Sequence, residues 1–229
     1  MNITAALYLL TGLVDVYAEY MHLRSVTHIT RPLLMPLLLA CYLSATGLRL
    51  TARDRLMAGA IAFSWVGDVV LMSAGGRELW FLGGLVAFLI AHLFYIAAFT
   101  QVADRQLQPV LRRHIWLALP LAAYLAGLLS VLVPAVDAHM RPPIAIYGLV
   151  IGTMVLFSIN RYKRLNDRSF ALVLSGAVLF MLSDSLIAVN KFLCHGDLPL
   201  SGVWIMLLYI LGQYCISQGM IRNDKPVLT

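Results

Sequence analysis

The chain has 229 residues, of which 61% are hydrophobic and only 12% are charged, and its mean hydropathy is +0.83. Soluble domains carry about 25% charged residues, so this composition excludes a soluble globular fold. The formal net charge of +6 implies no nucleic-acid partner, because anionic membrane lipids attract basic residues that flank apolar segments.

Apolar segments follow one another almost from end to end. A helical span needs about 20 mostly apolar residues, whereas a membrane β-barrel needs shorter segments of alternating polarity. We therefore predict an all-α polytopic membrane bundle of eight transmembrane helices that forms a single domain over residues 1–229. The predicted spans are residues 3–21, 30–48, 56–74, 79–101, 114–133, 142–159, 169–189 and 199–220. The first span lacks the basic start and the cleavage site of a signal peptide and is expected to stay.

The basic residues between these spans are divided unequally between the two faces. On the face of the termini are Arg49, Arg53, Arg55, Arg105, Arg112, Arg113, Arg161, Lys163, Arg164, Arg168, Arg222 and Lys225. On the opposite face are Arg24, Arg31, Arg77, Arg141 and Lys191. Because cytoplasmic loops carry the excess of Lys and Arg, both termini are predicted in the cytoplasm, with the chain in a bacterial inner membrane.

Ionisable residues of the first two spans lie close to the outer face. Asp15 and Glu19 are one turn apart, and Arg31 opens the second span. Solvated acids and snorkelling arginines are common at this depth. This is the simplest interpretation of Asp15 and, as an interfacial anchor, of Arg31. The alternative is that Glu19 and Arg31 border a substrate-binding site.

The third and seventh spans each carry one aspartate, Asp68 and Asp184. Each lies about five residues before the end of its span, which is roughly 8 Å below the outer surface on helices running in the same direction. An ionisable group inside a span is a functional candidate by default, although a single acid can also join helices by hydrogen bonds. Two acids at one depth predict a polar pocket that opens toward the outer leaflet. Ser64 and Ser183 are candidates for orienting these acids.

The remaining polar candidates lie in the fourth, sixth and eighth spans and, for Asn190, just beyond the seventh. His92 lies about 13 residues into the fourth span, roughly 20 Å below the outer surface, and Tyr95 shares its helical face. We expect this pair at the floor of the pocket, deeper than the aspartates; the alternative is a hydrogen-bonded structural histidine. Tyr147, Asn190 and Gln213 are candidates for contacting a substrate.

Five patches of the chain resemble the lysoplasmalogenase family, also called YhhN-like. They are RPLLMPLL from Arg31, FSWVGDVVLM from Phe63, GLVAFLIAHLFYIAAF from Gly84, GAVLFMLSDSLIAVNKF from Gly176, and YILGQY from Tyr209. The resemblance implies hydrolysis of the vinyl ether bond of lysoplasmalogens to a fatty aldehyde and glycerophosphocholine or glycerophosphoethanolamine. It also implies that Asp68 and Asp184 are central to catalysis. One departure is Arg31, where the family pattern tends to have Lys.

The chemistry of this reaction suits a pair of carboxyl groups. Hydrolysis begins with protonation of the β-carbon, which gives an oxocarbenium ion that water attacks. Burial raises the pKa of a carboxyl group, so that it can stay protonated near neutral pH, and glycosidases divide acid and base roles between two such groups. Which aspartate is the acid is left open. No cofactor or metal is predicted. For a phosphate head group, Arg31 ranks first among the cations Arg31, Arg77, Arg141 and Lys191.

Three other functions compete with this one. An intramembrane aspartyl protease would need Gly at position 65 and Tyr at position 183, where the chain has Trp65 and Ser183. A metal-dependent lipid hydrolase could use His92 with the two aspartates, but the three protein ligands of catalytic zinc are often rich in histidine. Of the histidines, only His92 lies well inside a span, and its expected depth differs from that of the aspartates. Buried carboxylates also suit a proton-coupled transporter or a lipid-binding membrane protein. The sequence indicates no oligomeric state.

Overall fold

The computed structural model describes residues 3–47, 50–75, 77–101 and 108–221, and all regular structure in this part of the chain is helical. The elements are α1 (Ile3–Tyr20), α2 (Arg24–Thr46), α3 (Ala52–Met72), α4 (Glu78–Thr100), α5 (Val110–Arg113), the 3-10 helix η1 (Ile115–Ala118), α6 (Leu119–Ala135), α7 (Arg141–Ile159), α8 (Asp167–Phe192) and α9 (Ser201–Ile221). The prediction of an all-α polytopic membrane protein is confirmed.

Seven described segments are long and apolar enough to cross a membrane, counting η1 and α6 together. The first helix, α1, is not among them, because Asp15, Glu19 and its tyrosines and threonines lower its hydropathy. The count of eight spans therefore stays a prediction. Large apolar side chains cover much of the outer surface; Leu79 is 79% exposed and Leu10 is 59% exposed. Such a surface is suited to lipid, and the protein is an integral membrane protein.

Several helices are longer than their predicted spans. Residue Thr51 caps α3 by accepting a hydrogen bond from the Asp54 backbone, while the Asp54 side chain accepts one from the Thr51 backbone, so α3 begins at Ala52. The helix α8 continues to Phe192, beyond the predicted end at residue 189. Hydropathy marks only the apolar middle of such helices, because their polar ends can project into the head-group region.

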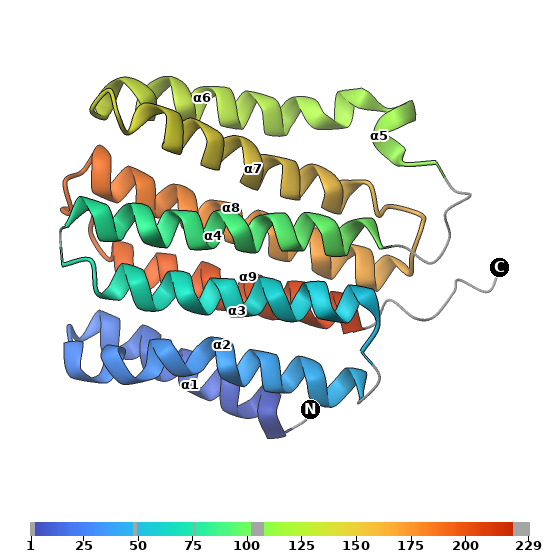
Figure 1. Cartoon of the computed structure of the whole chain (residues 1–229), viewed down its shortest axis with the longest axis horizontal. Helices are drawn as coiled ribbons and strands as arrows, with labels where there is room; N and C mark the ends of the chain where they lie inside the picture. The colour runs from blue at the N-terminus through green and yellow to red at the C-terminus, as the bar shows by residue number, and fades with distance from the viewer. Residues whose placement is uncertain (1–2, 48–49, 76, 102–107, 222–229) are drawn as a thin grey trace.

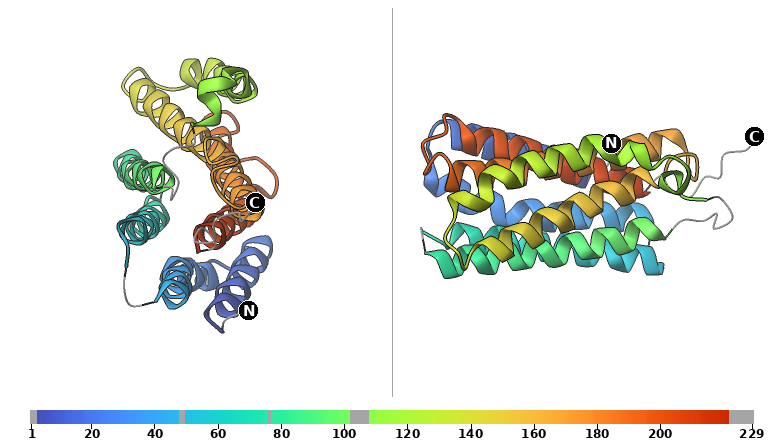
Figure 2. Two further views of the ribbon diagram at one scale, coloured as in Figure 1. Left: turned by 90° about the vertical axis from the view of Figure 1, so that its right-hand side faces the viewer. Right: turned by 90° about the horizontal axis from the view of Figure 1, so that it is seen from above.

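All the long helices except α6 form a closed ring in the part of the chain that the structure describes. Around the ring, α1, α2, α3, α4, α7, α8 and α9 each pack against the next, and α9 packs against α1. The view along the helices shows this ring, with α6 outside it against α7 (Figure 2). The start of α1 and the end of α9 lie at the same end of the bundle (Figure 1).

Glycines bring two pairs of neighbouring helices unusually close together. A Cβ atom added to Gly176 of α8 would lie 2.6 Å from the Gly212 carbonyl oxygen of α9. A Cβ atom added to Gly67 of α3 would lie 2.5 Å from Cδ2 of Phe88 of α4. Because Gly67 precedes Asp68, the close approach of α4 fixes the part of α3 that carries this acid.

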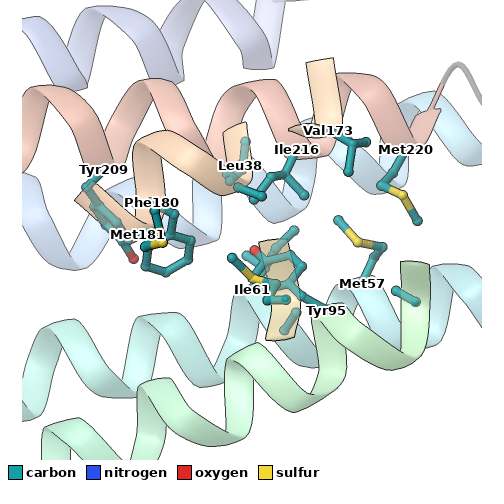
Figure 3. Packing of buried hydrophobic residues seen from close by; sticks show 14 of the residues in the cluster. Leu38, Met57, Ile61, Tyr95, Val173, Phe180, Met181, Tyr209, Ile216 and Met220 are labelled. Carbon is teal, nitrogen blue, oxygen red and sulfur yellow. The ribbon is translucent and has the colours of Figure 1, made fainter. Parts of the chain in front are cut away.

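A core of buried apolar side chains fills the interior of the ring. Figure 3 shows Phe180 and Met181 beside Tyr209, with Tyr95 near Ile61.

The described basic residues leave the predicted orientation untested. Four of the cations counted for it lie outside the described residues: Arg49, Arg105, Arg222 and Lys225.

Candidate active site

A polar cavity of about 290 Å³ lies near the end of the ring where α3 and α8 end and α4 and α9 begin. Its polar lining residues are Arg31, Asp68, Ser183, Asp184, Asn190, Lys191 and Tyr209. The structure therefore brings both predicted aspartates to one cavity, together with two cations. Six of these seven residues were candidates in the sequence, and Tyr209 was not.

The carboxylate of Asp68 is held by Tyr209. The Tyr209 hydroxyl donates a hydrogen bond to Asp68 Oδ2 at 2.8 Å, across the ring from α9 to α3. The Tyr209 ring packs edge-on against Phe88 and Phe180, with centroids 6.0 and 5.3 Å away. A signal for this residue was present in the sequence, because Tyr209 lies one turn before the candidate Gln213 on the same helical face.

The carboxylate of Asp184 is contacted by two residues from other helices. The Tyr147 hydroxyl of α7 donates a hydrogen bond to Asp184 Oδ2. The His92 Nε2 atom of α4 lies 3.6 Å from the same oxygen and has no hydrogen-bond partner among the described residues. The His92 ring is fully buried and meets the Tyr147 ring edge-on.

The predicted difference in depth between His92 and Asp184 is wrong. Because α8 runs on to Phe192, Asp184 lies eight residues before the helix end rather than about five. At a rise of about 1.5 Å per residue, the longer helix accounts for only about 4 Å of the expected difference of roughly 12 Å, so residues counted from the helix ends do not give the relative depths of α4 and α8. Asp68 lies four residues before the end of α3.

A second polar cluster lies apart from the cavity. The Tyr95 hydroxyl donates a hydrogen bond to Gln213 Oε1, and Gln213 Nε2 donates one to Ser64 Oγ at 3.1 Å. All three are fully buried, and none lines the cavity. The predictions that Ser64 orients Asp68, that Tyr95 forms the floor of the pocket and that Gln213 contacts substrate are therefore not supported by these contacts.

Two further candidates line the cavity but bond elsewhere. The Ser183 hydroxyl donates a hydrogen bond to the Ile205 carbonyl at 2.9 Å, so this contact does not support the prediction that it orients Asp184. Successive residues of a helix point in directions about 100° apart, which turns Ser183 toward α9. The Asn190 side-chain oxygen accepts a hydrogen bond from the Leu198 backbone at 3.1 Å and ties down the connection between α8 and α9.

The guanidinium of Arg31 is fixed at the cavity edge by two acids of α1. Its Nε atom donates a hydrogen bond to Asp15 Oδ2 at 3.4 Å, and its Nη2 atom donates one to Glu19. Thr30 also donates a hydrogen bond to Asp15. Asp15 is also fully buried, so its interpretation as a solvated surface acid is wrong. Glu19 pairs with Arg31 but is not a lining residue.

Among the other candidate cations, only Lys191 reaches the cavity. Its Nζ atom lies 4.5 Å from the centroid of the Phe81 ring. Arg77 donates a hydrogen bond to the Ser73 carbonyl, and Arg141 donates one to the Val136 carbonyl. A phosphate in the cavity would therefore have Arg31 and Lys191 as its cationic neighbours.

A narrow apolar slot of about 60 Å³ borders the polar cavity between α4, α6, α7 and α8. The two spaces share five lining residues: Leu71, Phe81, Phe88, Asp184 and Ile187. Asp184 is the polar member of this shared wall, whereas Asp68 lines the polar cavity but not the apolar slot. Among the described residues, no three His, Cys, Asp or Glu side chains are grouped so that they could hold a metal ion.

The region of the chain that contains the polar cavity matches a known protein family. The YhhN family model matches residues 26–220, which include every residue that lines the polar cavity. The chain belongs to the YhhN family. No solved structure matches it with significance.

Curated relatives of this YhhN-family chain carry the name lysoplasmalogenase. Lysoplasmalogenase TMEM86B of Homo sapiens is 33% identical over 75% of this chain and 66% of its own length. Lysoplasmalogenase TMEM86A of Homo sapiens is 30% identical over 76% and 68% of the two chains. A lysoplasmalogenase of Mycobacterium tuberculosis is 30% identical over 61% of this chain, which spans 54% of that relative.

Proposed function

We propose that this protein is a lysoplasmalogenase, an integral membrane hydrolase that cleaves the vinyl ether bond of lysoplasmalogens. The products are a fatty aldehyde and glycerophosphocholine or glycerophosphoethanolamine. The observation that carries the proposal is that Asp68 and Asp184 line one cavity in a chain whose relatives are named lysoplasmalogenases. The substrate is a lysophospholipid taken from the membrane.

The proposed reaction transfers a proton from one carboxyl group to the vinyl carbon remote from oxygen. This step leaves an oxocarbenium ion between the other vinyl carbon and the ether oxygen. The second carboxylate stabilises that cation and takes a proton from the attacking water, which gives a hemiacetal. The hemiacetal hydroxyl loses its proton, the carbon–oxygen bond to glycerol breaks, and the glycerol oxygen is protonated. Glycosidases divide two carboxyl groups between comparable roles.

We assign the proton donor to Asp184 and the base to Asp68. In the substrate, the carbon that accepts the proton is on the hydrocarbon side of the vinyl ether, and the carbon that water attacks is on the oxygen side. Asp184 borders both the apolar slot and the polar cavity, and Asp68 borders only the polar one. Tyr147 and Tyr209 are positioning residues, because each donates a hydrogen bond to one of the carboxylates. We assign His92 a positioning role toward Asp184, because its Nε2 atom lies 3.6 Å from Asp184 Oδ2.

The head group is assigned to the polar cavity. Arg31 and Lys191 supply positive charge for the phosphate, and Asn190 is a further polar neighbour. The ion pairs of Arg31 with Asp15 and Glu19 fix the direction of its guanidinium before a lipid binds. Such preorganisation lowers the ordering cost of binding.

The membrane topology that we propose has eight spans, α1 included, in one domain over residues 1–229. Both termini are in the cytoplasm of a bacterium, and the cavity opens toward the outer leaflet of the inner membrane. Support comes from the excess of Lys and Arg on the face of the termini. Accessibility of single cysteines introduced at the α3–α4 and α8–α9 connections, probed in intact cells, tests this orientation.

The reaction type is tested by incubating the purified protein with three lysolipids that differ only in the bond at the first glycerol carbon. These are an alkenyl ether, a saturated alkyl ether and an acyl ester. Mass spectrometry should detect aldehyde from the alkenyl lipid alone. Retention of that activity in chelator supports the metal-free mechanism, and its loss would favour a metal-dependent hydrolase. Movement of intact lipid between liposome leaflets without cleavage would favour a transporter.

A further inference from the structure

The apolar slot is a second compartment beside the polar cavity, and the proposed mechanism assigns no ligand to it. It lies between α4, α6, α7 and α8, and its walls include Phe88, Leu125, Leu129 and Ile151. Tyr147, Asp184 and Ser185 are the polar residues that line it, near its border with the polar cavity. A substrate that fills both spaces would cross that border beside Asp184.

We propose that this slot binds the hydrocarbon chain of a single-chain lipid whose head group occupies the polar cavity. The identity of that lipid rests on the proposed function. A lysophospholipid has a charged head, a linking oxygen and one apolar chain in linear order. The lining follows the same order, from Arg31 and Lys191 in the polar cavity, past Asp184, to the leucines of α6. Burying the chain against these leucines is favourable because it removes apolar surface from water.

The length of the slot fits the first part of one hydrocarbon chain. Its α7 lining runs from Ile144 to Ile151, a distance of roughly 10 Å along the helix. The first part of an extended chain occupies this length, and the remainder passes α6 into the bilayer.

The position of α6 gives the chain a lateral route into the slot. This helix lies outside the ring and packs mainly against α7 (Figure 2). Only Leu121 and Leu132 of α6 are buried. A wall that is held by so few contacts can move aside without opening the ring that carries the aspartates.

Gly148 of α7 sets the width of the slot. A Cβ atom at this position would lie 3.1 Å from Cδ2 of Leu129, on the opposite wall. A larger side chain at residue 148 therefore narrows the slot, and a smaller one at residue 129 widens it. The matched control is Gly127 of α6, which is exposed and has no atom within 4 Å of an added Cβ.

The first test of the chain site does not depend on hydrolysis. A saturated alkyl lysophosphocholine with a diazirine at mid-chain is photoactivated on the wild-type protein in nanodiscs, and the labelled peptides are mapped. We expect labelling within residues 125–132 and 144–151 that excess unlabelled alkyl lysolipid suppresses. Labelling elsewhere only, or labelling that excess lipid leaves unchanged, would overturn the proposal. If the protein releases no aldehyde but is labelled as expected, the chain site stands and the proposed function fails.

The second test measures chain-length preference with alkenyl substrates of short and long chain. Gly148→Leu should lose about tenfold or more in kcat/KM on the long chain relative to the short one, since a single methylene in an apolar pocket changes specificity by this order. Leu129→Ala should shift the preference toward longer or bulkier chains, and Gly127→Leu should change neither. Because Gly148→Leu could fold poorly, Leu129→Ala provides an independent result. An unchanged chain-length profile in folded Leu129→Ala and folded Gly148→Leu would refute the site.

Discussion

The hydrogen bond from Tyr209 to Asp68 gives a sharp test of how the carboxylates are positioned. Tyr209→Phe removes the hydroxyl that donates to Asp68 Oδ2 at 2.8 Å and keeps the ring that packs on Phe88 and Phe180. A hydrogen bond to a charged group contributes about 1.5–3 kcal/mol, and 1.4 kcal/mol corresponds to tenfold in rate. Asp68 borders the cavity, so water can replace part of the lost bond. We therefore expect the lower end, a loss of about tenfold in kcat.

The assay for this prediction is aldehyde release from a lysoplasmalogen by purified, folded protein in detergent. Tyr8→Phe is the matched control, because Tyr8 of α1 is also buried and its hydroxyl donates a hydrogen bond to the Ile210 carbonyl of α9 at 2.9 Å. It should cost about 1 kcal/mol of stability and leave kcat unchanged. A Tyr209→Phe enzyme with wild-type kcat, or equal losses of kcat in both variants, would refute the reasoning.

Three further predictions concern the second acid, the head group and the helix packing. Tyr147→Phe should lower kcat more than Tyr209→Phe, by about a hundredfold. The reason is that Asp184 is only 9% exposed, so water cannot readily replace the lost hydroxyl. Equal kcat values for Tyr147→Phe and Tyr209→Phe would count against this prediction. Lys191→Gln should raise KM by roughly fivefold, as expected for about 1 kcal/mol of charge attraction, with kcat kept; an unchanged KM for lysolipids would exclude Lys191 from the phosphate site. Gly176→Ala should destabilise the protein by about 1–3 kcal/mol, because its Cβ would meet backbone atoms of α9, whereas Gly127→Ala should not. Thermal unfolding monitored by fluorescence measures the difference, and equal midpoints would contradict the close α8–α9 contact.

Much of the fold was predictable because membrane-spanning helices have long apolar runs in their sequence. Helix ends were less predictable, since capping residues such as Thr51 and Asp54 extend a helix beyond its apolar part. Depth counted from the predicted ends of the spans did not reveal the contact between His92 and Asp184, because α8 runs three residues further than predicted and the ends of neighbouring helices are not level.

The candidate site was predictable in its acids and less so in its partners. Asp68 and Asp184 are conspicuous because few charged residues interrupt the spans. Tyrosines are less conspicuous, since they are also common in packed cores and at membrane interfaces, and Tyr209 was missed although it shares a helical face with the candidate Gln213. Ser64 and Ser183 were assigned by proximity in the chain, whereas their hydroxyls contact Gln213 and Ile205 of α9. Such pairings depend on how helices rotate against one another.

The most direct test of the paired-aspartate account is isotope exchange in heavy water with Asp68→Asn and Asp184→Asn. Both folded variants should lose aldehyde release by about a hundredfold or more. Without the base, the oxocarbenium ion in Asp68→Asn returns to vinyl ether. Rotation about its carbon–carbon single bond lets the original hydrogen leave in place of the added deuterium, so recovered substrate should gain one deuterium at the protonated carbon. Asp184→Asn should leave recovered substrate unlabelled. Release of aldehyde at the wild-type rate by either variant would contradict the account, and exchange in Asp184→Asn alone would reverse the two roles.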